Sequence, residues 1–359
     1  MKILIIGPFP DPITGNSLAN QIIYENLPKY NEDVQVDNIN TSYSCLKENL
    51  GKLNFSKVWH YFKQYVEIHK VLKCDKFYYT SGQTFYGVLK YFPYLLLAKL
   101  FRKEIIVHIH GNFLHKEFEA LRGIKQYAFK KTLTLCDKGI VLSKSLRKNL
   151  SPFLKESQIF ELENFVEDII LDHQFYKDFN KLRIIYLSNL MTEKGIFYLL
   201  EALTILSEMD VDFDAKIAGG IDPAIANEIE SKLNELPDSV EYLGLVFGSD
   251  KKELLNWGNV FVFPTYYSME GQPISIFEAY ASGNVILTTK HAGIPDVFKE
   301  EINGFYIEKK SSSSIANRLQ LMSENMNEHI NISNHNIKEA AEKYRVENFI
   351  NKLYNILNE

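Results

Sequence analysis

The sequence is poor in cysteine and has no long uncharged apolar run. Its cysteines, Cys45, Cys74 and Cys136, lie far apart and match no CxxC or zinc-ligand spacing, which excludes a disulfide-built fold and predicts reduced thiols. The longest stretch without Asp, Glu, Lys or Arg, Leu254–Met269, has 16 residues and contains Asn and Pro, so it is too short and polar to span about 30 Å of hydrocarbon. Only four apolar residues follow Lys2, fewer than the roughly 7 of a signal peptide. We therefore expect a cytoplasmic protein.

Length and composition predict a globular protein with two domains. At roughly 100 to 200 residues per domain, a chain of 359 residues suggests two, and 46 % hydrophobic residues are enough to give each domain a core. The 24 Phe and 21 Tyr are a heavy aromatic content. We assign most of these rings to the core, with sugar or lipid surfaces as their other use.

Charge is distributed unevenly along the chain. Residues 1–178 contain 24 Lys and Arg against 19 Asp and Glu, whereas residues 179–359 contain 16 against 26. Residues 85–155 hold 14 basic and 4 acidic residues around apolar stretches such as Tyr91–Leu97. This segment suits an anionic membrane surface, the inner face of the cell membrane, although a solvated helix surface explains it equally well. Nucleic acid is not an expected partner, because no recognition motif appears.

Short β-branched and aromatic runs alternate with amphipathic segments in both halves, which is typical of repeated βαβ units. The runs are Ile3–Ile6, Val34–Ile39, Phe77–Thr80, Ile105–His110 and Gly139–Leu142, then Arg183–Leu187, Ala215–Ala218, Val240–Leu243, Val260–Phe263, Val285–Thr288 and Phe305–Ile307. The sequence predicts an α/β fold of two doubly wound Rossmann-like domains facing across a cleft. Parallel strands of such folds bind ligands at their carboxyl ends, so the site is expected there.

An irregular, charge-rich stretch ending at Asn180 separates the two halves. We expect a first domain over residues 1–165, a linker over 166–180 and a second domain over 181–344. The last segment, 345–359, has apolar residues at helical spacing, including Phe349, Ile350 and Leu353. It predicts an amphipathic helix that packs back on the first domain.

The loop after the first expected strand contains Gly15, at the start of the next helix. The loop lacks a GxGxxG pattern, and Asn40 stands where a dinucleotide ribose would need an acidic residue. A nicotinamide-dependent dehydrogenase is therefore disfavoured. Gly15 would let backbone amides approach a phosphate, while an ordinary βα turn explains it as well.

Two histidines lie on one face of the fourth expected strand, because side chains alternate along a strand. His110 stands at its carboxyl end beside Gly111, where it is placed to meet the cleft, although a structural role is the alternative. His108 is assigned to packing.

The second half carries a lysine loop and a pair of glutamates. Lys194 precedes a helix amino terminus, where its charge adds to the helix amides and suits a diphosphate. The strand Val260–Phe263 leads to Glu270, Pro273 suits the first turn of a helix, and Glu278 lies about one and a half turns in. The amides of Gln272–Ser275 then suit phosphate, and the carboxylates suit sugar and ribose hydroxyls. A capping glutamate and a solvated one would explain either carboxylate alone.

With these motifs the chain resembles glycosyltransferase family 4, whose members are retaining, nucleotide-sugar-dependent enzymes of the GT-B fold. The resemblance covers nearly the whole chain and rests on the glycine loop, His110-Gly111, Asn164, Lys194-Gly195 and the Glu-x7-Glu pair Glu270/Glu278. It implies a hexosyltransferase-type enzyme that uses a nucleotide-sugar donor, needs no metal or other cofactor, and acts on a glycan or polyprenyl-linked acceptor. The implied process is surface-polysaccharide synthesis, such as that of capsule or O-antigen.

The resemblance also implies a role for each site residue. Glu278 would bind the ribose, Lys194 the diphosphate and Glu270 the donor sugar, which His110 would face from the first domain; Glu270, His110 and Lys194 are the implied catalytic residues. The wider donor-binding set is Gly15, Asn189, Leu245, Val246, Gly271, Gln272, Pro273, Ile274 and Ser275, with Leu245 and Val246 lining the base pocket. Two positions depart from the family: Asn189 replaces an arginine beside the diphosphate, and Gln272-Pro273 replaces an aromatic-glycine pair. A UDP-sugar is the expected donor.

Two other functions are compatible with this fold. A GT-B nucleotide-sugar epimerase or a phosphorylase is one, and the Glu-x7-Glu pair disfavours both. A catalytically silent scaffold is the other, and the presence of Glu270, Glu278, Lys194 and His110 argues against it. The Asp-x-Asp string at Asp210–Asp214 precedes a strand, away from the expected cleft, so we do not expect it to bind a metal.

Overall fold

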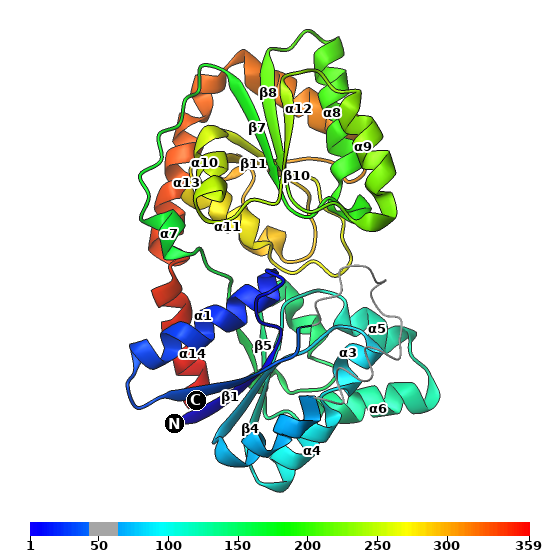
Figure 1. Cartoon of the computed structure of the whole chain (residues 1–359), viewed down its shortest axis with the longest axis vertical. Helices are drawn as coiled ribbons and strands as arrows, with labels where there is room; N and C mark the ends of the chain where they lie inside the picture. The colour runs from blue at the N-terminus through cyan, green and yellow to red at the C-terminus, as the bar shows by residue number, and fades with distance from the viewer. Residues whose placement is uncertain (43–63) are drawn as a thin grey trace. The chain divides into compact units, whose positions relative to one another are not determined.

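The computed structural model describes residues 1–42 and 64–359, and its contacts divide the chain into two units. The first unit comprises residues 1–164, 269–272 and 346–359, and the second comprises residues 165–268 and 273–345. Each unit contains one six-stranded parallel sheet. The prediction of two doubly wound α/β domains is therefore confirmed (Figure 1).

The first sheet has the strand order β2-β1-β3-β4-β5-β6. Its strands are β1 (Lys2–Gly7), β2 (Gln35–Asn40), β3 (Lys76–Thr80), β4 (Glu104–Ile109), β5 (Lys138–Val141) and β6 (Ile159–Glu161). Its helices are α1 (Gly15–Tyr30), α3 (Phe85–Leu89), α4 (Phe92–Leu100), α5 (Leu114–Ala120), α6 (Gly123–Leu133), α14 (Val346–Asn358) and the 3₁₀ helices η1 (Tyr65–Lys73), η2 (Lys144–Asn149) and η3 (Glu156–Gln158). The edge strand β6 was not predicted.

The second sheet has the order β12-β11-β10-β7-β8-β9. Its strands are β7 (Leu182–Leu187), β8 (Phe213–Ala218), β9 (Val240–Gly244), β10 (Val260–Phe263), β11 (Val285–Thr288) and β12 (Gly304–Tyr306). Its helices are α7 (Asp168–Leu171), α8 (Ile196–Glu208), α9 (Ala226–Asn234), α10 (Gly248–Trp257), α11 (Ile274–Ala281), α12 (Ser312–Glu324), α13 (Ile330–Lys343) and the 3₁₀ helices η4 (Thr192–Lys194), η5 (Pro223–Ile225), η6 (Ile294–Asp296) and η7 (Met326–His329). Helices α8, α9 and α12 cover one face and α10, α11 and α13 the other (Figure 1).

Covering both faces of the sheets explains why the strand runs are apolar throughout. Every residue of β10 and β11 is buried, as expected for parallel strands packed between helix layers. Cys74 and Cys136 are buried free thiols, whereas Cys45 lies outside the described residues. No helix in the described part of the chain is long and apolar enough to cross a bilayer.

The carboxy-terminal helix α14 packs within the first unit. It buries Phe349, Ile350 and Leu353, and Lys138 donates a hydrogen bond from Nζ to the carbonyl of Ile356 at 3.0 Å. Asn31 Nδ2 donates to Tyr354 Oη at 2.8 Å. The helix is thus part of this unit's core even though it comes last in the chain.

His108 is a fully buried core side chain of β4. Its Nδ1 shares a hydrogen bond with Tyr78 Oη at 2.5 Å, and its ring lies 3.9 Å from that of His110, centroid to centroid. Burial, together with the neighbouring His110, lowers the pKa of His108 well below its usual value. The neutral imidazole is therefore the form that the folded protein accepts.

Acid should weaken the fold through this histidine. Below pH about 6.5 the unfolded chain protonates His108 while the folded chain does not, so the free energy of unfolding falls as pH decreases, by roughly 1–2 kcal/mol between pH 7 and 5. We expect His108→Gln to reduce this loss, measured by urea unfolding at both pH values. His69→Gln, at an exposed position, is the control. An unchanged loss in His108→Gln would assign the acid sensitivity to other groups.

Candidate functional site

Lys194 lies at the carboxyl edge of the second sheet, in the turn that joins β7 to α8. The next residue, Gly195, has φ +83°, and a Cβ there would lie 2.3 Å from the carbonyl oxygen of Pro264, so only glycine allows this approach. The Lys194 ammonium lies over the rings of Phe263 and Tyr267, 5.2 and 5.3 Å from their centroids. The lysine is thus placed beside the loop that follows β10.

Asn189 and Leu245 both lie beside Gly220 at the same edge. A Cβ on Gly220 would lie 3.4 Å from Leu245 and 3.8 Å from the Asn189 side-chain oxygen. Gly219, at φ +143°, donates a backbone hydrogen bond to the carbonyl of Gly244 at 2.7 Å. This hydrogen bond joins the ends of β8 and β9, and Asn189 brings the loop after β7 beside them. The Leu245 side chain is 62 % exposed.

Val246, the other residue expected to line a base pocket, follows Leu245 in the loop between β9 and α10. It is partly buried and packs against the hydrophobic core of the second unit. Leu245 is therefore mainly exposed to solvent, whereas Val246 is held by its contacts with the core.

Helix α11 begins one residue later than predicted, with Pro273 as its N-cap and Ile274 and Ser275 in its first turn. Ile274 and Ser275 are partly exposed at this terminus, whereas Glu278, the fifth helical residue, is buried. The first-turn amides of a helix carry a partial positive charge and can receive phosphate oxygens.

Glu278 is paired with a lysine that the sequence analysis missed. Lys251 Nζ of α10 lies 2.7 Å from Glu278 Oε1 and 2.9 Å from Glu167 Oε1. Burial alone would lower the pKa of Lys251, but the two carboxylates raise it well above its usual value. The pairing joins side chains from three separate segments, and neither the spacing nor the residue types of the sequence indicate it.

The first of the two glutamates belongs to the other unit. Glu270 is buried and lies in the segment Met269–Gln272, which groups with the first unit. A Cβ on Gly271 would lie 2.1 Å from the carbonyl oxygen of His110, so this glycine permits a close approach to the end of β4. The structure thereby brings Glu270, Gly271 and His110 into one part of the first unit.

Gln272 is held by two hydrogen bonds to Asn164. The Asn164 backbone N donates to Gln272 Oε1 at 3.2 Å, and Asn164 Nδ2 donates to the Gln272 carbonyl at 2.7 Å. Both residues are buried. Gln83 Nε2 also donates to the carbonyl of Met269 at 3.2 Å, so the segment is held at both ends.

His110 follows β4 and has an enclosed Nε2 with no hydrogen-bond partner among the residues that the structure describes. Burial lowers the pKa of His110 to about 3. The ring is therefore neutral at physiological pH. It can donate or accept a hydrogen bond with a polar group, but it does not supply a positive charge.

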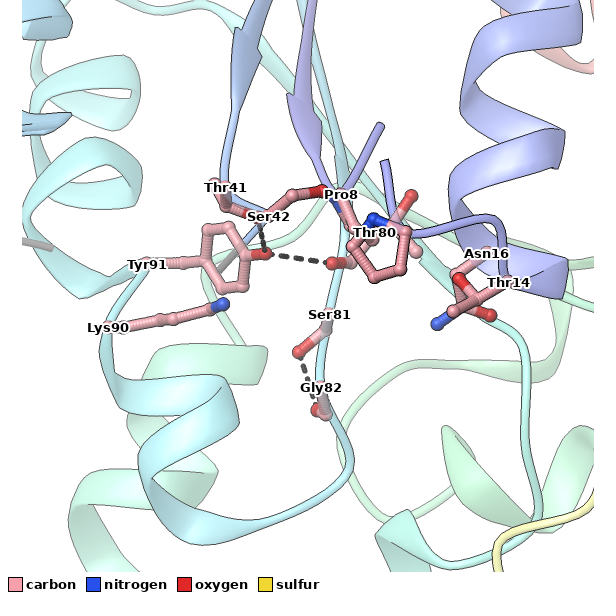
Figure 2. Close-up of a pocket in the computed structure, with 11 residues that line it drawn as sticks. Pro8, Thr14, Asn16, Thr41, Ser42, Thr80, Ser81, Gly82, Lys90 and Tyr91 are labelled. Carbon is pink, nitrogen blue, oxygen red and sulfur yellow. Dashed lines mark hydrogen bonds between the residues drawn. The ribbon is translucent and has the colours of Figure 1, made fainter. Parts of the chain in front are cut away.

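A pocket of about 190 Å³ opens at the carboxyl ends of β1, β2 and β3 in the first unit (Figure 2). Its walls are mostly hydroxyl and amide groups with one cation: Pro8, Pro12, Thr14, Asn16, Thr41, Ser42, Thr80, Ser81, Gly82, Lys90 and Tyr91. Gly15 itself does not line it, although both of its neighbours do. Only the position after each strand could have indicated these residues, since they form no motif.

The Asp-x-Asp aspartates lie at the opposite, amino edge of the second sheet. Asp212 and Asp214 pair with Lys181 at 3.0 and 2.9 Å. Asp214 is a residue of β8 rather than a residue that precedes it, because β8 begins two residues earlier than predicted. Across residues 1–42 and 64–359, no three His, Cys, Asp or Glu side chains gather as a metal site requires, and the metal expectation stays a prediction.

The second unit is similar in sequence to a known protein family. Residues 170–344 match the family model described as "Glycosyl transferases group 1". The chain is 31 % identical over 150 residues to the putative colanic acid biosynthesis glycosyltransferase WcaL of Escherichia coli, covering 40 % of this chain and 36 % of that protein. It is 26 % identical over 220 residues to the Campylobacter jejuni N,N'-diacetylbacillosaminyl-diphospho-undecaprenol alpha-1,3-N-acetylgalactosaminyltransferase, covering 60 % and 53 %.

Among solved structures, the chain is similar to Anabaena Alr3699/HepE in complex with UDP. The TM-score is 0.76 at 16 % sequence identity, and the match covers 100 % of both chains. A likeness at this identity concerns the fold alone, which is the GT-B fold. The second unit therefore carries a glycosyl transferases group 1 domain, and relatives of that domain are named as bacterial polysaccharide glycosyltransferases.

Proposed function

We propose that the protein is a retaining glycosyltransferase that moves a sugar from a UDP-sugar to a glycan or lipid-linked glycan in cell-surface polysaccharide synthesis. The observation that carries the proposal is Glu278, which is buried and ion-paired in the second turn of α11. The backbone amides of the first turn of α11 lie at the amino terminus of the same helix, within a domain that matches the group 1 model. A carboxylate beside a helix amino terminus suits a nucleotide, because the amides bind phosphate and the carboxylate accepts hydrogen bonds from ribose hydroxyls.

The second unit supplies the donor-binding groups in this proposal. Lys194 and the amides at Ile274 and Ser275 bind the diphosphate, and Glu278 binds the ribose. Asn189, Leu245 and Val246 contact the nucleotide, for which the exposed Leu245 offers an apolar surface. Uridine is the proposed base, and the UDP bound by the similar Anabaena protein supports it.

The first unit supplies the groups that act on the sugar. Glu270 accepts hydrogen bonds from sugar hydroxyls, and the neutral His110 forms a hydrogen bond with the sugar without adding charge. No carboxylate nucleophile is assigned. We propose instead that the leaving diphosphate takes the acceptor's proton as the new glycosidic bond forms on the same face, which retains the configuration.

The pocket at β1, β2 and β3 is the proposed acceptor site. Hydroxyl and amide side chains such as Asn16, Ser42 and Ser81 suit the hydroxyls of a sugar. The Tyr91 ring, with Lys90 Nζ 5.0 Å from its centroid, provides an aromatic wall. An acceptor sugar with an anionic neighbour fits this combination.

Release of nucleoside diphosphate tests the activity. Incubated with a panel of nucleotide sugars and a glycolipid acceptor extract, the protein should release UDP from one UDP-sugar, and release should continue in EDTA, because no step is assigned to a metal. The product's anomeric configuration, read by NMR, should match that of the donor. Release from no donor on the panel would contradict the enzyme proposal, and restoration by Mg²⁺ or Mn²⁺ after loss in EDTA would contradict metal independence.

Lys194 should matter more than Asn189. Negative charge develops on the leaving diphosphate, and fixed positive groups stabilise that transition state. Since Asn189 is neutral where the resembled family has an arginine, Lys194→Ala should lower turnover at saturating donor by about 10²-fold or more, whereas Asn189→Ala loses only an ordinary hydrogen bond. A Lys194→Ala enzyme within a few fold of the parent would show that another cation serves the diphosphate.

We also propose that the first unit binds the membrane surface through α4. Phe92, Leu96 and Leu100 lie four residues apart on one face of this helix, and Leu96 and Leu100 are 54 % and 74 % exposed. The exposed residues Phe101 and Arg102 follow directly. An apolar stripe with a basic border suits an anionic bilayer, to which each cation contributes on the order of 1 kcal/mol.

Cosedimentation with liposomes should show this binding. The protein should bind anionic vesicles of phosphatidylglycerol, less as salt rises, and not neutral vesicles of phosphatidylcholine. Leu96→Ser/Leu100→Ser should weaken binding, while Leu321→Ser, which replaces an equally exposed leucine in the second unit, should not. If the two variants sediment alike, α4 is an ordinary solvated surface.

A further inference from the structure

Lys251 reaches Glu278 from a different helix, and its ammonium lies between two carboxylates. The distances are 2.7 Å to Glu278 Oε1 and 2.9 Å to Glu167 Oε1. The side chains of Lys251 and Glu278 are 16 % and 6 % exposed, whereas that of Glu167 is 28 % exposed. The lysine is thus largely enclosed and directed at the more buried of its two partners.

A carboxylate this enclosed needs a partner to stay charged and in one orientation. Lys251 is the only side chain that the described part of the chain shows bonded to the Glu278 carboxylate. Because Lys251 occupies Oε1, it fixes the carboxylate torsion and leaves the other oxygen, Oε2, for a further donor. Glu167 holds the ammonium from a third segment, so the lysine itself has little freedom to turn away.

We propose that Lys251 is a positioning residue for nucleotide recognition. It holds the Glu278 carboxylate in the orientation in which its second oxygen accepts hydrogen bonds from the ribose hydroxyls. The inference rests on the proposed nucleotide-binding role of Glu278 and assigns the orientation of that carboxylate to Lys251. Lys251 acts through Glu278 and does not touch the nucleotide.

A purely structural ion pair makes a different prediction. In that case, loss of Lys251 would lower the melting temperature but leave nucleotide recognition by the folded protein unchanged. A positioning role instead alters the ability to distinguish a ribose from a deoxyribose, because that distinction depends on a correctly oriented acceptor. The ratio of two nucleotide affinities also cancels any general effect of removing a positive charge near a diphosphate.

The test compares UDP with 2′-deoxy-UDP by isothermal titration calorimetry on the full chain. The parent should bind UDP about tenfold or more tightly than 2′-deoxy-UDP, as expected for a hydrogen bond to a charged group. Both Glu278→Gln and Lys251→Met should lose most of this preference. The double variant Lys251→Met/Glu278→Gln should be no worse than Glu278→Gln alone, because the lysine acts through the carboxylate.

Two further variants keep the result interpretable. Lys252→Met removes the same charge from the next position of α10, where the described residues show no ion pair, and should keep the parent's preference. Lys251→Arg keeps the positive charge and should retain part of the preference for UDP. The melting temperatures of all variants identify any that fail to fold. If Lys251→Met fails to fold, Lys251→Gln takes its place. Because Gln can still donate a hydrogen bond to Glu278, this variant should lose only part of the preference for UDP.

The outcomes separate this inference from the proposed function. If Glu278→Gln loses the preference for UDP while folded Lys251→Met keeps it, Lys251 is a structural residue and the inference is wrong. If the parent shows no dependence on the 2′-hydroxyl, or if Glu278→Gln keeps the parent's full preference for UDP, the proposed ribose role of Glu278 fails and the inference fails with it. Additive losses in the double variant would also overturn it, since they would require Lys251 to act independently.

Discussion

The parallel arrangement of both sheets is the constraint on which the candidate site depends. In a parallel sheet every strand ends at the same edge, so the loops that follow neighbouring strands must lie side by side. In the second unit this edge gathers Asn189 and Lys194, from the loop after β7, with Leu245, from the loop after β9, through contacts at Gly195 and Gly220. The chemistry of the unit follows from which residues happen to come after a strand, rather than from any continuous motif.

Close backbone approach is the second requirement at these edges. Gly271 lies so near the His110 carbonyl that a methyl group would collide with it, and Gly195 has the same relation to Pro264. Asn164 adds two hydrogen bonds that fix Gln272. The segment carrying Glu270 is therefore tied to the first unit. This restricts the positions that its carboxylate can take and favours the proposed, preorganised contact with a sugar.

Much of the fold could be predicted from the sequence, and the pairing of charges could not. Strands such as Val260–Phe263 and Val285–Thr288 coincide with β10 and β11, because a buried parallel strand is apolar at every position. The short strand β6 and the assignment of Met269–Gln272 to the first unit depend on contacts that no local period records. Lys251 is the clearest case, since its position in α10 resembles that of any surface lysine and only the fold brings it to Glu278.

The electrostatics of the second sheet differ between its two edges, and this bears on the proposed binding of a diphosphate. At the amino edge, the single Lys181 pairs with both Asp212 and Asp214, so these three side chains keep a net negative charge. At the carboxyl edge, Lys251 is neutralised by Glu278 and Glu167, so it adds no net positive charge for a phosphate. Lys194 and the amino terminus of α11 are the positive groups to which the proposed function assigns the diphosphate. Positive charge held on backbone amides and one lysine is fixed in direction before the ligand arrives, and a group that need not reorganise stabilises a developing charge most effectively.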